Sequence, residues 1–109
     1  MRLNLNELEI RDEAHDGRHK LVLCGKLIGT TAHALGTAIV ALCEGDASEI
    51  VIDLRKLDFV DSDGVQTLIA SQEKARDHGC QFFLEPGQQA IGRLLELVGL
   101  EPAQRQRQP

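Results

Sequence analysis

Short apolar runs alternate with longer amphipathic stretches along most of this chain. The apolar runs are predicted strands and lie at residues 20–27, 49–54 and 80–85. Between and after them, apolar residues recur every three or four positions, which predicts helices over about 30–44 and 62–78 and around 91–98. Strands that alternate with helices favour right-handed crossovers and parallel pairing, so this alternation predicts an α/β fold.

The N-terminal segment adds a hairpin to this pattern. Residues 3–10 alternate like a strand with a slip near Asn6, which indicates a bulge or two short pieces, and Asp16-Gly17 is a hairpin turn dipeptide. The predicted order is β-β-α-β-α-β-α. We expect one domain over residues 1–101, with a mixed sheet of about four strands and helices packed against it.

The predicted core is aliphatic, because the chain has three Phe and neither Trp nor Tyr. The second helix is expected to begin at Asp61–Gly64. We expect these apolar side chains to be largely buried: Val51, Ile52, Leu54, Leu68, Ile69, Leu94, Leu95 and Val98. Residues 102–109 contain no apolar residue beyond Ala103, so a disordered tail is expected there.

Composition excludes several classes of partner. The net charge is −5, without a basic cluster or an aromatic platform, so nucleic acid is not an expected partner. No apolar run has the length of a membrane span and no signal peptide opens the chain, so a cytoplasmic protein without membrane insertion is expected.

Neither cysteines nor histidines form a metal-ligand pattern. Cys24, Cys43 and Cys80 are far apart in apolar runs, and we interpret them as small buried hydrophobic residues. The four histidines, His15, His19, His33 and His78, are interpreted as surface residues. No metal site and no cofactor is therefore predicted.

The segment "DFVDSDGVQTL", residues 58–68, concentrates the candidate functional residues. Asp61 or Ser62 can cap the second helix, and Asp63 falls in its first turn, where the helix dipole favours an acid. Gly64 is expected to leave the helix N-terminus open, and Phe59 to anchor the preceding link. On the residues alone, this segment is either only a helix cap or a regulatory loop built on one.

Catalytic patterns are missing from this segment. Asp61 and Asp63 are two residues apart and diverge on a helix, and Ser62 lies in no GxSxG pattern. The sequence contains no P-loop and no GxGxxG. We therefore predict a protein that is not an enzyme.

Residues 49–101 carry motifs that resemble the STAS domain, the module of bacterial anti-sigma-factor antagonists and of the cytoplasmic ends of sulfate transporters. The matching motifs are Asp53-Leu54, Phe59, Asp61-Ser62-Asp63-Gly64, Gly79 and Leu97-Val98-Gly99-Leu100. "LVLCGKLIGTTAHAL" is similar to the first strand and helix of the family, so the resemblance covers about residues 18–101.

The resemblance implies partner switching between proteins. In the antagonists, the second hydroxyl of "DSSG" is phosphorylated by an anti-sigma factor that is also a serine kinase, and the phosphate ends their binding. Here Asp63 occupies the phospho-acceptor position and supplies a permanent negative charge, as a phosphomimetic residue would. The loop Asp61, Ser62, Asp63 and Gly64 would bind the partner, with Phe59, Gln66 and Thr67 as further contacts.

Two more departures from the family pattern bear on function. Ile28 stands where the family often has Asp, and the usual terminal strand after Leu100 is missing. Whether Ser62 is modified, and whether Asp63 is natural or introduced to mimic phosphate, stays open, as does homodimer formation.

Two functions therefore compete. The first is an anti-sigma-factor-antagonist type of binding module. The alternative is the STAS subunit of an ABC-type lipid transport complex, which binds and stabilises the ATPase without phosphorylation. An adjacent gene for a kinase-like anti-sigma factor, or for an ATPase and a permease, would separate them.

Overall fold

The computed structural model describes residues 2–87, 89–97 and 99–100 and contains one mixed sheet with three helices in that part of the chain. The elements follow the order β1 (Arg2–Asn4), β2 (Leu8–His15), β3 (Arg18–Leu27), α1 (Gly29–Glu44), β4 (Glu49–Val60), α2 (Ser62–Asp77), β5 (Gln81–Glu85) and α3 (Gln89–Leu97). The predicted order is confirmed, with one strand added at the N-terminus. The predicted tail at residues 102–109 lies outside the described residues.

The sheet has five strands rather than about four, in the spatial order β1-β2-β3-β4-β5. The slip near Asn6 is a chain reversal: the Leu5 N–H donates to the Leu8 carbonyl at 2.8 Å, and β1 returns antiparallel to β2. The β2–β3 hairpin turns at Asp16 and Gly17, both with positive φ, as the Asp-Gly dipeptide predicts. Because α1 and α2 form crossovers, β3, β4 and β5 pair in parallel.

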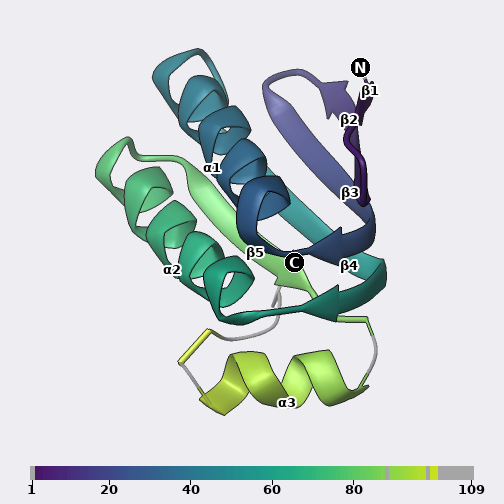
Figure 1. The fold of residues 1–109 in the computed structure, drawn as a ribbon. Helices are drawn as coiled ribbons and strands as arrows, with labels where there is room; N and C mark the ends of the chain where they lie inside the picture. The colour runs from purple at the N-terminus through teal and green to yellow at the C-terminus, as the bar shows by residue number, and fades with distance from the viewer. Residues whose placement is uncertain (1, 88, 98, 101–109) are drawn as a thin grey trace.

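The main core lies between the sheet and the helices. Figure 1 shows α1 and α2 side by side on one face of the sheet, with α3 apart from them at its lower end. The fully buried side chains of this core include Leu21, Leu23, Leu35, Ile39, Ile52, Leu54, Leu57 and Leu68. Every one is aliphatic, as the composition predicts.

Most of the predicted core residues are confirmed as buried. Val51, Ile52, Leu54, Leu68 and Leu95 are all 3% exposed or less. Ile69 and Leu94 are partly buried and pack against the core. Val98 lies outside the described residues.

The opposite face of the sheet carries an ionic network, which consists of Lys20, Asp53, Arg55 and Glu85. Asp53 is only 2% exposed, and its carboxylate accepts hydrogen bonds from Arg55 Nε at 3.0 Å and Nη2 at 2.8 Å. Lys20 Nζ lies 3.7 Å from Asp53 Oδ2 and 3.6 Å from Glu85 Oε1. The side-chain hydrogen bonds from Arg55 lower the pKa of Asp53 although its burial opposes this.

β4 is longer than predicted, and this changes the interpretation of the segment before α2. The predicted strand ended at Leu54, but β4 pairs with β3 as far as Val60. The pairing register shifts twice, so residues of β4 bulge out and the alternation of buried and exposed positions is interrupted. Because the alternation is irregular there, the sequence pattern did not predict the second half of β4 as a strand.

Candidate functional site

The second helix begins where the sequence predicts. β4 ends at Val60, and Asp61 is the N-cap of α2, whose side-chain Oδ1 accepts from the Gly64 backbone N–H at 2.9 Å. The Val65 N–H donates to the Asp61 carbonyl at 3.0 Å, which closes the first helical turn. Of the two residues that the sequence offered as the cap, Asp61 has this role and Ser62 is the first helical residue.

The start of α2 is also fixed to the end of β3. The Asp61 N–H donates to the Leu27 carbonyl at 3.2 Å. A Cβ atom on Gly64 would lie 2.5 Å from the same Leu27 oxygen and 2.5 Å from Val60 Cγ2. Gly64 is buried, so the expectation that it leaves the helix N-terminus open is wrong: glycine is needed because the backbone of α2 approaches β3 so closely.

Ser62 and Asp63 occupy the outer side of this turn. Both are exposed, and Asp63 is the acidic residue in the first turn of α2. A negative charge at this position interacts favourably with the helix dipole. The four residues of the "DSDG" loop therefore divide into two with structural roles, Asp61 and Gly64, and two that face solvent.

Three further residues were predicted as partner contacts, and the structure separates them. Phe59 is 51% exposed, so its predicted role as an anchor is wrong: because β4 bulges at Asp58, Leu57 and Val60 fill the core instead. Gln66 is exposed, whereas Thr67 is partly buried at the contact between helices, where a Cβ on Gly36 would lie 3.5 Å from Thr67 Cγ2. Phe59 and Gln66 are thus accessible, and Thr67 is mainly a packing residue.

Both long helices start at the same end of the molecule. Leu27 and Val60 pair as the last residues of the adjacent parallel strands β3 and β4, and Figure 1 shows α1 and α2 beginning beyond them. In α1 the N-cap residue is Ile28, which has no side-chain cap. The hydroxyl of Thr31 accepts from the Ile28 N–H at 2.8 Å instead. Thr31 therefore supports the helix start from inside the first turn.

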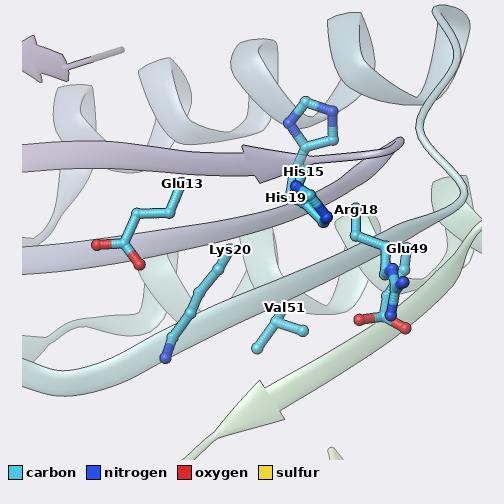
Figure 2. A pocket seen from close by; sticks show the side chains of 7 residues that line it. All are labelled: Glu13, His15, Arg18, His19, Lys20, Glu49 and Val51. Atoms are coloured by element: carbon cyan, nitrogen blue, oxygen red, sulfur yellow. The ribbon is translucent and has the colours of Figure 1, made fainter.

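A hollow of about 220 Å³ lies beside the β2–β3 hairpin and was not predicted. Figure 2 shows its lining residues, which are Glu13, His15, Arg18, His19, Lys20, Glu49 and Val51. Acidic and basic side chains are mixed there, so the hollow has no single charge preference. No group of three or more potential metal ligands occurs in the described part of the chain.

His19 differs from its interpretation as a surface residue. Its side chain is 18% exposed, and Nδ1 lies 3.1 and 3.0 Å from the two carboxylate oxygens of Asp12. The two residues face each other diagonally across β2 and β3. The contact could have been predicted from the hairpin turn at Asp16-Gly17. That turn pairs His15 with Arg18, and this register brings Asp12 near His19.

Comparison with known proteins adds a family and several similar folds. A family model described as "Mlab, STAS domain" matches residues 10–102. A crystal structure of an anti-sigma factor antagonist from Mycobacterium paratuberculosis is 30% identical, with a TM-score of 0.76, over 90% of this chain and 84% of that chain. No curated protein matches the sequence.

Two other solved structures resemble the chain in fold. The anti-sigma factor antagonist SpoIIAA in its unphosphorylated form is 17% identical, with a TM-score of 0.76, over 84% of this chain and 81% of that chain. The murine anion transporter Slc26a9 is 17% identical, with a TM-score of 0.65, over 80% of this chain and 14% of the transporter. Among the described residues of the present chain, no helix is both long enough and apolar enough to cross a membrane.

Proposed function

Because this chain belongs to the STAS domain family, we propose that it is a regulatory module that binds a protein partner through one defined surface. This docking surface consists of Phe59, Ser62, Asp63 and Gln66. STAS domains are generally non-catalytic binding modules. The proposed action is therefore association and dissociation with a cytoplasmic partner, and no chemical step on a substrate.

The observation that most directly supports this proposal is that two residues of the "DSDG" loop have structural roles while the other two are exposed. Asp61 and Gly64 hold the start of α2 in place, so the loop presents a fixed surface. Asp61, and not Ser62 or Asp63, accepts the cap hydrogen bond, and Ser62 and Asp63 are exposed, as is Phe59, which precedes them in the chain and is 51% exposed. An exposed aromatic ring within a few residues of exposed polar groups has the composition that protein contact sites favour.

For the first of the two candidate functions, the anti-sigma-factor-antagonist type, the proposed partner is a serine-kinase type of anti-sigma factor. Asp63 stands where the family resemblance puts the phospho-acceptor. A carboxylate cannot accept a stable serine-type phosphate, but it carries part of the negative charge that phosphate would add. Asp63 would therefore hold the module in a state like the phosphorylated one, with weakened binding to such a kinase.

The test is a titration of the wild-type protein and the Asp63→Ser variant against a serine-kinase type of anti-sigma factor from the same organism. The variant should bind more tightly at low salt, and the gain should shrink at high salt, because a charge at an interface rim acts through screened electrostatics. The variant should also become phosphorylated at residue 63 in the presence of ATP, which the wild type should not. Asp77→Ser is the matched control, since it removes an equal charge from an exposed residue at the other end of α2.

Equal affinity of wild type and Asp63→Ser at both salt concentrations would show that residue 63 serves only the helix start. A gain of the same size in Asp77→Ser would attribute the effect to net charge alone. Either result would exclude Asp63 as a charge that weakens binding to a kinase of this type.

A second candidate is a STAS subunit that binds the ATPase of an ABC-type lipid transporter. The observation that favours it is again Asp63, because an interaction without a phosphorylation cycle needs no hydroxyl at that position. In this case the chain should co-purify with an ABC-type ATPase from the same organism and raise the melting temperature of that ATPase. Asp63→Ser should then leave binding unchanged, whereas Phe59→Ala should weaken it, since the exposed ring would be a main contact.

A further inference from the structure

Strand β5 (Gln81–Glu85) lies at one edge of the sheet, and among the described residues only β4 pairs with it. The parallel pairing with β4 is regular from Glu49 to Asp53 and contains no bulge. Phe82 and Phe83 are both partly exposed. A regular edge strand with partly exposed aromatic side chains is a surface onto which another strand can pair.

The main chain of β5 shows which backbone groups are directed at the open edge. The Gln81 N–H donates to the Ser48 carbonyl at 3.0 Å, so the backbone of Gln81 is directed toward β4. Because successive strand residues direct their backbone groups to alternate edges, those of Phe83 also face β4, whereas those of Phe82 and Leu84 face the open edge. Two N–H groups and two carbonyls of the described chain are therefore available to a further strand.

We propose that β5 pairs antiparallel with β5 of a second copy of this chain, around a two-fold axis perpendicular to the sheet. The axis passes between the two copies of Phe83, because only this register opposes all five residues of both strands. Phe82 of each copy then lies opposite Leu84 of the other, and each of these two pairs exchanges two N–H···O=C bonds. The proposal goes beyond partner binding and uses no residue of the docking surface.

The apolar side chains of β5 are self-complementary in this register. On the helix-covered side, Phe82 meets Leu84 of the second copy, and this contact extends the apolar rows that begin at Ile50 and Ile52 of β4. On the other side, the two Phe83 rings face each other in a pair without main-chain hydrogen bonds, where opposed side chains approach most closely. Apolar groups therefore meet apolar groups on both faces of the sheet.

The polar ends of β5 are complementary as well. Gln81 of one copy lies opposite Glu85 of the other, so an amide that can donate faces a carboxylate and no two like charges are directly opposed. Within each copy, the Glu85 carboxylate lies 3.6 Å from Lys20 Nζ, which balances its charge. The opposite edge of the sheet is less suitable, because β1 has only three residues, all of them exposed, and begins with the charged Arg2.

Sedimentation equilibrium of the full chain over a range of concentrations tests the proposal. Pairing of two five-residue strands is a small contact, so we expect a weak dimer in exchange with the monomer. Phe83→Lys places two positive charges opposite each other at the axis and should raise the dissociation constant of the dimer by about tenfold or more. Thr37→Lys is the matched control, since it adds the same charge at an exposed position of α1 and should leave the constant unchanged.

Cross-linking tests the register in a Cys24→Ser background, which removes the partly exposed native thiol. Phe83→Cys should form a disulfide between two chains under mild oxidation, because directly opposed residues of such a pair have Cα atoms about 4.5 Å apart. Gln81→Cys should cross-link much less, although Gln81 is the more exposed residue. Its two copies would be offset by about 13 Å along the strands, which is the rise of four residues.

A chain that remains monomeric up to millimolar concentration would overturn the proposal. Unchanged dimerisation of Phe83→Lys, or an equal loss in Thr37→Lys, would overturn it as well. Cross-linking of Gln81→Cys that equals or exceeds that of Phe83→Cys would refute the antiparallel register. Circular dichroism checks that Phe83→Lys is folded, and the comparison of the two cysteine variants decides the question independently of that variant.

Discussion

Gly64 is the residue of the "DSDG" loop with the least space for a side chain. The atoms that a new methyl group would meet belong to the Leu27 backbone and to Val60, a buried side chain at the end of β4. A backbone carbonyl in a sheet cannot move aside without disturbing the pairing of β3 with β4. The close approach of α2 to the sheet therefore depends on this glycine.

Gly64→Ala should lower the free energy of unfolding by about 1–3 kcal/mol, as overpacking in a closed site does. Urea unfolding followed by circular dichroism measures this loss. Gly92→Ala is the matched control: it also adds a methyl group to a helical glycine, but the nearest atom, Pro86 Cβ, would be 3.9 Å away. That variant should be as stable as the wild type or up to about 1 kcal/mol more stable. Equal effects of the two variants would refute the steric role of Gly64.

Residue roles were predictable where they depend on nearby sequence. The cap at Asp61 and the exposed position of Asp63 follow from the order of residues around a helix start. The burial of Gly64 depends on Leu27, which is distant in sequence, and the exposure of Phe59 depends on a bulge in β4. The pairing of His19 with Asp12 requires the register of two strands. These contacts are tertiary, so local patterns did not contain them.

Helix α2 has the clearest relation between pattern and burial among the described elements. Leu68 on its inner face is fully buried, whereas Gln66, two residues earlier, is exposed. Positions two residues apart point to different sides of a helix, so one faces the sheet and the other faces solvent. The packing energy of the element is therefore concentrated on the face that contains Leu68.

Leu68→Ala should reduce the free energy of unfolding by about 2–5 kcal/mol, because the surrounding core fills the cavity only in part. Gln66→Ala, on the exposed side of the same helix, should change it by less than about 0.5 kcal/mol. Denaturant unfolding of both variants beside the wild type measures the contrast. A small loss for Leu68→Ala would mean that α2 is packed loosely and that the assigned core face is wrong.

At the level of elements, the sequence predicted their type and order better than their number and length. The helices have regular periodicity and glycines near their ends, so α2 was placed within one residue of its observed bounds. The strand β1 has only three residues, which is too short for a pattern, and β4 is interrupted by bulges. Elements without regular periodicity are those that the sequence alone could not define.

On the scale of the whole molecule, the two faces of the sheet are stabilised by different forces. The helix-covered face has an aliphatic core, while the other face has the ionic network of Lys20, Asp53, Arg55 and Glu85. Asp53 is the buried acid of this network, and hydrogen bonds from Arg55 hold its pKa below the ordinary value. The ionised carboxylate is thus better stabilised in the folded than in the unfolded chain.

The stability of the domain should therefore decrease in acid through Asp53. A group with a lowered folded pKa contributes its stabilisation above its unfolded pKa, about 3.9 for Asp, and loses it as the pH falls through the folded value. Asp53→Asn should be less stable than the wild type at pH 7, and the difference should narrow below about pH 4. Unfolding by urea at a series of pH values measures both curves.

Asp77→Asn provides the control for this pH dependence, since Asp77 is exposed at the end of α2. The free energy of unfolding of this variant, plotted against pH, should run parallel to that of the wild type. If Asp53→Asn also ran parallel to the wild type, the buried carboxylate would not be the source of acid sensitivity.

The separation of roles within the "DSDG" loop has an evolutionary consequence. Asp61 and Gly64 are constrained by folding, whereas the side chains of Ser62 and Asp63 are exposed. Substitutions at positions 62 and 63 should therefore change the stability of the fold only a little, because surface substitutions away from caps and cores are nearly neutral. A lineage carrying this fold could exchange a switchable hydroxyl for a fixed charge at residue 63 in a single step and keep the scaffold intact.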